Sequence, residues 1–290
     1  MITVFVGSNL PKLGDLRRSV LCEVMEDVGI SPTFPIIDKS PFLYGDPRKI
    51  AKEFLSTIRC AQSTDIVIIA DGGTGAARVM YHLFVERDRT IVVPSCTVQG
   101  YSDACLYPMY AFVVENMKRC FYGPNFIDED FVPDVEEVEA HIEFDTAESN
   151  WAPPDTPYKL FPACTRPLLQ VPGLFYDQII EYFKINRVLL MLEDNYPEGE
   201  SGDIAFYEDL TSLLPYLQAV ELGGGAVTFS SDSLEAVKLY CTSMNISVPF
   251  FVNVKFGHSD MCVAPLQYGQ EVILDYNYLR GLSVRPVDGE

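Results

Sequence analysis

The chain has little of what several protein classes require. It has 21 lysines and arginines against 41 aspartates and glutamates, so its formal net charge is −20 at pH 7. This charge repels nucleic acid and anionic membrane surfaces, so neither is expected as a partner. No apolar run approaches the roughly 18 residues of a membrane span, and the first residues lack the basic start and cleavage site of a signal peptide. We therefore expect a cytoplasmic protein.

Metal-binding and disulfide patterns are also missing. The chain has only three histidines, and its eight cysteines are scattered, with no CxxC pair and no Cys/His cluster of zinc-site spacing. Most of the cysteines lie in apolar contexts, which favours reduced thiols in the core. No metal ion is expected.

The first half of the chain alternates apolar strands with amphipathic helices. This order is typical of a doubly wound parallel sheet with right-handed crossovers. Asp46 and Pro47 have the residue types of an N-cap and a first helical position. The expected strands are 2–6, 35–37, 66–70 and 91–93, and the expected helices lie around 13–28, 47–58 and 79–84.

The pattern fails between residues 125 and 167, where prolines interrupt it. An acidic run, 128–148, lies inside this stretch; we interpret it as a solvated face, and a role in binding a cation or basic ligand stays open. Strands and helices resume after it. The sequence therefore predicts a Rossmann-like domain at 1–130, a connection at 131–168 and a smaller C-terminal α/β domain at 169–290.

A glycine-rich turn, Gly72–Gly75, joins the expected strand 66–70 to a helix. Open α/β enzymes place a nucleophile at such a turn, because the bend exposes one side chain beside free helix-start amides. Here the residue after the glycines is Ala76, which has no nucleophilic atom. The turn could also cradle a phosphate, but it has neither the lysine of a P-loop nor the spacing of a dinucleotide fingerprint.

An acid and a base also follow expected strands. Glu193 ends the strand 188–192, and His258 follows the strand 249–254 beside a glycine. Ligands of open α/β proteins bind at the carboxyl ends of the strands. Each residue alone is explained as well by loop capping or a structural histidine. Together with the turn at Ala76, they indicate a catalytic triad that lacks its first member.

Short segments in this order resemble the LD-carboxypeptidase family of serine peptidases, which includes the microcin C self-immunity peptidases. The match to the family's GYSD at Gly100–Asp103 is literal, and Leu190–Asp194 is similar to its LFLED. The other segments that carry the resemblance are Phe42–Gly45 with Ile50–Phe54, Asp65–Arg78, Phe121–Pro124, Val248–Pro249, Phe256–His258 and Ala264–Gly269.

The resemblance implies a Rossmann-like N-terminal domain, a smaller C-terminal domain and an active site between them, often in a homodimer. It also implies a Ser–Glu–His triad that needs no metal or cofactor. The acid carries over to Glu193, the base to His258 and the nucleophile position to Ala76. Gly73 and Ala77 would supply oxyanion-hole amides.

Arg78 and Ser102 are the expected substrate-binding residues, although an ion pair at the helix start explains Arg78 as well. Family members hydrolyse the amide before a terminal D-alanine in muropeptides, or a peptidyl conjugate of microcin C. The resemblance therefore implies a small peptide or peptidyl conjugate as the substrate.

The chain departs from the family at Ala76 and around Gln170–Leu174, where nothing matches the family's GGNL segment. Three interpretations follow. The chain is a serine peptidase whose serine has been replaced by alanine, or it is a natural pseudoenzyme that binds or regulates. In the third and least favoured interpretation, catalysis uses Thr74 or Ser102 instead.

Overall fold

The computed structural model describes residues 2–6, 46–70, 75–87, 96–123, 156–193, 200–230, 234–252, 265–277 and 281–287. The chain divides into two compact units. Unit 1 is Met1–Glu136 with Gln170–Tyr176, and unit 2 is Glu137–Leu169 with Asp177–Glu290. The predicted helix at 13–28, the predicted strands at 35–37 and 91–93, and the acidic run 128–148 lie outside the described residues.

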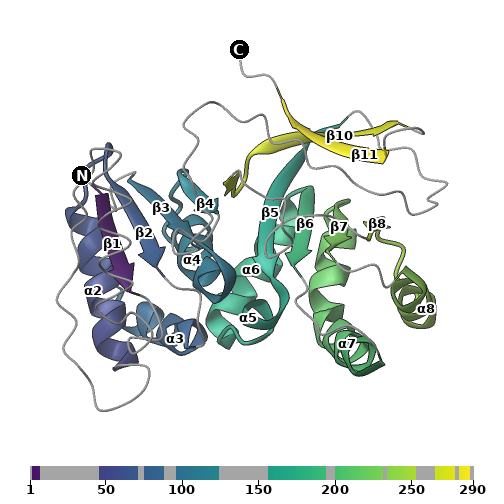
Figure 1. Cartoon of the computed structure of the whole chain (residues 1–290), viewed down its shortest axis with the longest axis horizontal. Helices are drawn as coiled ribbons and strands as arrows, with labels where there is room; N and C mark the ends of the chain where they lie inside the picture. Colours follow the sequence, from purple (N-terminus) through teal and green to yellow (C-terminus); the bar gives the residue numbers. More distant parts are fainter. Residues whose placement is uncertain are drawn as a thin grey trace. The chain divides into compact units, whose positions relative to one another are not determined.

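Unit 1 is a parallel sheet with helical connections (Figure 1). Its strands follow the order β1-β2-β3-β4, and each neighbouring pair is parallel. Its elements are β1 (Ile2–Val6), α2 (Pro47–Cys60), β2 (Ile66–Ala70), α3 (Ala76–Glu86), β3 (Thr97–Gly100), the 3-10 helix η2 (Ser102–Cys105), α4 (Leu106–Val113) and β4 (Cys120–Tyr122). The predicted Rossmann-like α/β architecture is confirmed.

Helix α2 begins where the sequence predicts. The side chain of Asp46 accepts a hydrogen bond from the backbone N–H of Arg48 at 3.0 Å, and Pro47 occupies the first turn, where its missing N–H costs nothing. The apolar positions of α2 face inward, and Phe54 packs edge-on against Phe5 of β1 and Tyr107 of α4. The core of unit 1 therefore joins β1, α2 and α4.

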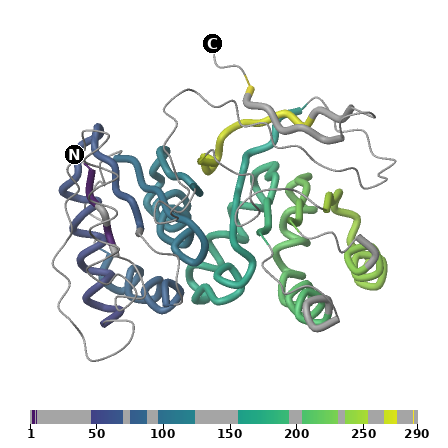
Figure 2. The backbone as a smooth tube through the Cα atoms, viewed as in Figure 1, coloured from purple at the N-terminus to yellow at the C-terminus, as the bar shows by residue number. Residues whose placement is uncertain are grey.

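Unit 2 contains a mixed sheet in the order β11-β10-β5-β6-β7-β8. Strands β5 to β8 are parallel, whereas β10 is antiparallel to both β5 and β11. In Figure 2, β5 to β8 follow the sequence colours from teal to yellow-green. The elements are β5 (Tyr158–Cys164), α5 (Thr165–Leu169), α6 (Gly173–Ile185), β6 (Val188–Glu193), α7 (Glu200–Leu222), β7 (Ala226–Phe229), α8 (Leu234–Met244), β8 (Phe250–Phe251), β9 (Leu266–Gln267), β10 (Glu271–Asn277) and β11 (Gly281–Pro286).

Part of the predicted connection at 131–168 is structured. Residues 158–169 form β5 and α5, although Pro162 lies inside the strand. The N–H of Lys159 bonds to Arg187 on the β6 side, and the N–H of Leu160 bonds to Gln270 on the other side. Because the direction of the N–H groups alternates along the strand, the N–H that Pro162 lacks would point away from β6. On that side the pairing of β5 with β10 ends at Lys159. The proline therefore leaves the β5–β6 pairing intact.

Among the described residues, none of the helices combines the length and the apolar character needed to cross a membrane.

Candidate active site

Ala76 is the first residue of α3, directly after the connection that follows β2. Its cap is Gly75, with φ of 125° and ψ of −15°, a conformation that L side chains rarely adopt. Glycine has no side chain to cap the helix, and among the described residues no side chain accepts from the first amides of α3. The methyl group of Ala76 is buried, with 1% exposed. The structure therefore places Ala76 at a strand–turn–helix junction, as the sequence predicts.

Ser102 lies beyond the neighbouring strand, at the same edge of the sheet. The register pairs Ile69 of β2 with Gly100 of β3, so the two strands end level with each other. Helix α3 contacts η2, which begins at Ser102. Unit 1 therefore brings the Ala76 position and Ser102 together at the carboxyl edge of its sheet.

The backbone at Ser102 is left-handed, with φ of 53°. A non-glycine residue pays a strain cost in this region. Gly100 makes the bend possible, because a Cβ there would collide with the carbonyl oxygen of Ala104. The literal GYSD match thus corresponds to a tight strand-to-helix bend that presents a half-buried serine.

Two other predicted residues lie in the first turn of α3. Ala77 is partly exposed, and Arg78 is exposed and donates its backbone N–H to the Gly75 carbonyl at 3.1 Å. The side chain of Arg78 is therefore accessible to a ligand. Gly73 and Thr74 lie outside the described residues.

Glu193 lies in unit 2 as the last residue of β6. It pairs in register with Cys164 at the end of β5, and only 1% of it is exposed. Strand β7 ends at the same edge, where the N–H of Ser230 bonds to the Leu192 carbonyl at 3.1 Å. A buried carboxylate at the carboxyl end of a central strand suits an orienting role.

His258 lies outside the described residues. The chain reaches it from β8, whose Phe251 pairs in register with Thr228 of β7. The parallel register therefore directs the end of β8 toward the same edge of unit 2 as Glu193.

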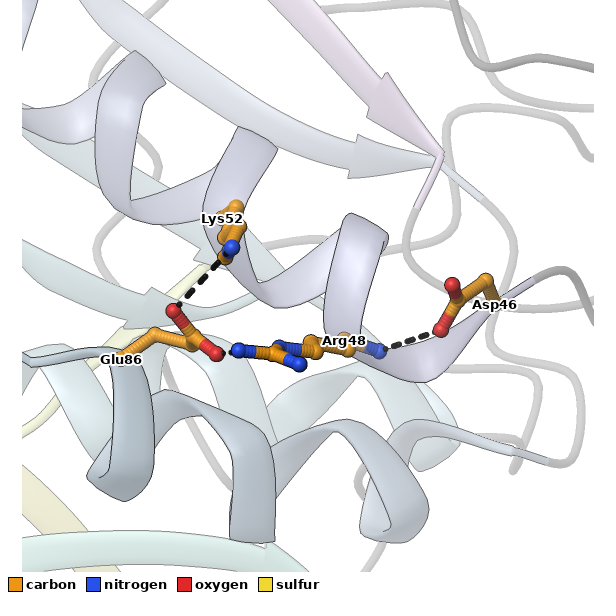
Figure 3. Close-up of polar contacts among 4 residues, drawn as sticks. All are labelled: Asp46, Arg48, Lys52 and Glu86. Carbon is orange, nitrogen blue, oxygen red and sulfur yellow. Dashed lines mark hydrogen bonds and ion pairs between the residues drawn. The ribbon is translucent and has the colours of Figure 1, made fainter.

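The C-terminal half of α3 is held by ion pairs with α2. Glu86 Oε1 accepts from Arg48 Nε at 2.6 Å, and Glu86 Oε2 lies 3.4 Å from Lys52 Nζ (Figure 3). The hydrogen bond from Arg48 lowers the pKa of Glu86, against a smaller opposing effect of burial. These contacts fix the helix whose first residue is Ala76.

A second cluster supports the C-terminal ends of α3 and α4. Arg87 Nε lies 3.0 Å from Glu115 Oε1, and Arg87 Nη2 donates to the Val114 carbonyl at 2.7 Å. Tyr110 OH donates to Glu115 Oε1 at 2.9 Å. Burial, followed by the nearby Glu115 carboxylate, raises the pKa of Tyr110 far above its ordinary range, so the phenol stays protonated and can donate.

The segment that lacks the family's GGNL residues packs into the core of unit 1. Phe175, near the start of α6, is fully buried, and its ring centroid lies 5.9 Å from those of Phe84 and Tyr110. Where the family has its GGNL segment, this chain therefore has a buried aromatic side chain, Phe175.

The sequence prediction missed one polar residue at this edge, Gln99 of β3. It is buried, with 8% exposed, and its Nε2 has no hydrogen-bond partner in the part of the chain that the structure describes. The sequence gives no clear signal for it, because Thr97 and Gln99 leave the short strand Thr97–Gly100 without an apolar run.

Comparison with known proteins identifies the fold. No family model matches the chain, and no curated protein matches it by sequence. The solved structure of muramoyltetrapeptide carboxypeptidase from Oxalobacter formigenes is similar, with a TM-score of 0.69 and 14% identity over 99% of this chain and 100% of that one. The microcin C7 self-immunity protein MccF, in its inactive mutant apo state, is similar with a TM-score of 0.66 and 15% identity over 99% and 96%. The chain therefore has the LD-carboxypeptidase-like fold that the motifs imply.

Proposed function

We propose, from the fold shared with these two proteins, that the chain is a serine peptidase of the LD-carboxypeptidase type with alanine in place of its nucleophile. The observation that carries the proposal is the position of Ala76. It begins α3 directly after the connection from β2, where a nucleophile would lie beside the amides at the start of the helix. Its substrates are muropeptide-type peptides or peptidyl conjugates with a cleavable amide.

The proposed chemistry uses a serine at position 76. Its Oγ attacks the amide carbonyl while His258 takes the hydroxyl proton, and amides at Gly73 and Ala77 stabilise the oxyanion. His258 then protonates the leaving amine, and water hydrolyses the acyl-enzyme. Glu193 orients the histidine and stabilises its charged form, a role suited to a carboxylate with 1% exposure. This chain has alanine at position 76 and therefore no Oγ, so its substrate binds without acylation.

A natural pseudoenzyme is the second candidate function. Two observations favour it: the methyl group of Ala76 is already packed, with 1% exposed, and Phe175 is buried where the family's GGNL segment is missing. In that case the chain binds a peptide or a partner through the same site. The two candidates share the binding step and differ in whether a serine restores catalysis.

The test is Ala76→Ser, assayed for release of D-alanine from the tetrapeptide L-Ala-γ-D-Glu-diaminopimelate-D-Ala by mass spectrometry. Ala77→Ser is the matched control, since it adds the same hydroxyl one residue later on the same helix. The peptidase proposal expects hydrolysis by Ala76→Ser alone, at a rate several orders of magnitude above the printed chain. A folded Ala76→Ser protein that binds the peptide and does not cleave it would contradict catalysis and favour the pseudoenzyme.

A further inference from the structure

Gln99 is a buried polar residue in the interior of the unit 1 sheet. Strand β3 pairs in parallel with β2 on one side and β4 on the other, so it is an interior strand with no free backbone edge. Gln99 is 8% exposed, and among the described residues its Nε2 has no hydrogen-bond partner. A buried amide donor without an acceptor lowers stability, and native proteins keep such groups mainly where they serve another purpose.

The amide group lies at the carboxyl end of β4. Gln99 pairs in register with Phe121, yet a Cβ placed on Gly123 would collide with Gln99 Nε2, and would lie 2.8 Å from Cδ and 3.0 Å from Cγ. The side chain therefore runs along the sheet to the residue after β4. A larger residue at position 123 would therefore displace the Gln99 amide from this place.

The backbone at the end of the same strand carries a second, independent feature. Ser102, three residues after Gln99, holds a left-handed φ of 53°. Backbone strain of this kind is concentrated at ligand-binding and catalytic sites, where the surrounding structure maintains it. An unpaired donor and a strained serine thus occupy one edge of one strand.

We propose that Gln99 is a peptide-binding residue whose Nε2 donates a hydrogen bond to a carbonyl oxygen of the bound peptide. A neutral amide donor suits a neutral carbonyl acceptor, and the bond would satisfy the group that the free protein leaves unpaired. The class of ligand rests on the proposed function. The contact itself does not depend on the nucleophile and can be measured in the printed chain, which does not turn over its ligand.

The experiment measures binding of the tetrapeptide L-Ala-γ-D-Glu-diaminopimelate-D-Ala by isothermal titration calorimetry. Gln99→Met removes the donor and keeps the length and shape of the side chain. Thr97→Val is the matched control, because Thr97 lies on the same face of β3, is 6% exposed, and has a hydroxyl that also lacks a partner. Urea unfolding of both variants reports on the fold.

We expect Gln99→Met to weaken binding of the tetrapeptide about tenfold, whereas Thr97→Val binds it like the unsubstituted chain. The urea midpoints of both variants should be no lower than that of the unsubstituted chain, because each variant loses an unsatisfied polar group. Three results would overturn the inference. They are equal affinity of Gln99→Met and the unsubstituted chain, a lower unfolding midpoint for Gln99→Met, and no binding by the unsubstituted chain at millimolar peptide. The proposed function is decided separately, because hydrolysis by Ala76→Ser can succeed or fail whichever way Gln99→Met behaves.

Discussion

Glu86, the last residue of α3, accepts a hydrogen bond from Arg48, in the first turn of α2, over 2.6 Å. Lys52, one turn further along α2, contacts the second oxygen of the same carboxylate at 3.4 Å. The contact joins residues 38 positions apart in the chain. It fixes the end of α3 that lies opposite the Ala76 position.

The Glu86 contacts predict a specific pH dependence. The hydrogen bond from Arg48 holds the pKa of Glu86 below its ordinary value of 4.5 in the folded chain. The contribution of Glu86 to stability is therefore present above about pH 4.5 and is lost as the pH falls through the lowered folded-state pKa. We expect Glu86→Gln to lower the urea midpoint at pH 7 and to have a smaller effect at pH 3.

The control for this measurement is Glu208→Gln, which changes an exposed glutamate on α7. An equal effect of Glu86→Gln at both pH values would show that packing, and not charge, explains the change.

The cluster around Glu115 predicts a larger loss. Only 5% of the Glu115 side chain is exposed, and its Oε1 is shared by Arg87 and the Tyr110 hydroxyl. Glu115→Ala removes the anionic partner of a partly buried cation, while the Tyr110 hydroxyl keeps the Leu83 carbonyl as an acceptor at 3.3 Å, so we expect a loss of about 3 kcal/mol in the free energy of unfolding. Tyr110→Phe removes the hydroxyl that contacts Glu115 and Leu83 and should cost about 1 kcal/mol. Denaturant unfolding of both variants checks the order; a smaller loss for Glu115→Ala than for Tyr110→Phe contradicts it.

Much of the fold could be predicted from local signals. β2 is apolar on both faces, as a central parallel strand requires, and the capping residues Asp46 and Pro47 locate the start of α2. The strand prediction at 188–192 is confirmed by β6, and this places Glu193 at the end of a strand.

Other elements could not be predicted from the sequence, because their residues are unusual for the structure that they form. Strand β3 carries Thr97 and Gln99, so no apolar run marks it. Strand β5 contains Pro162, which the sequence pattern assigns to the connection; the proline fits because its missing N–H lies on the side away from β6. The left-handed backbone of Ser102 depends on the packing of Gly100 against η2, a tertiary contact that sequence periodicity does not report.

The strain at Ser102 predicts a stabilising substitution. Glycine adopts a φ of 53° without the penalty that a Cβ imposes, so Ser102→Gly should raise the free energy of unfolding by up to about 1 kcal/mol. Ser102→Ala keeps the Cβ and serves as the control, with no comparable gain. Thermal and urea unfolding provide the measurement. A loss of stability in Ser102→Gly greater than in Ser102→Ala would show that the backbone there is not strained.

Loss of the Glu193 charge should lower the rate of hydrolysis once a serine is restored at position 76. In the Ala76→Ser background, Glu193→Gln keeps the shape of the side chain but removes its charge, so the histidine loses its orienting carboxylate. We expect the rate of D-alanine release to fall by about three to four orders of magnitude. Steady-state kinetics with the tetrapeptide measure the change. Retention of full activity by a folded double variant would remove Glu193 from the proposed triad.

Position 76 is proposed as the nucleophile position of this fold. The most direct test of this claim is reaction of Ala76→Ser and of the printed chain with a fluorophosphonate, followed by peptide mapping of the adduct. We predict one adduct on the variant, at position 76, and none on the printed chain. An adduct on Ser102 in the printed chain, or none on folded Ala76→Ser, would contradict the claim.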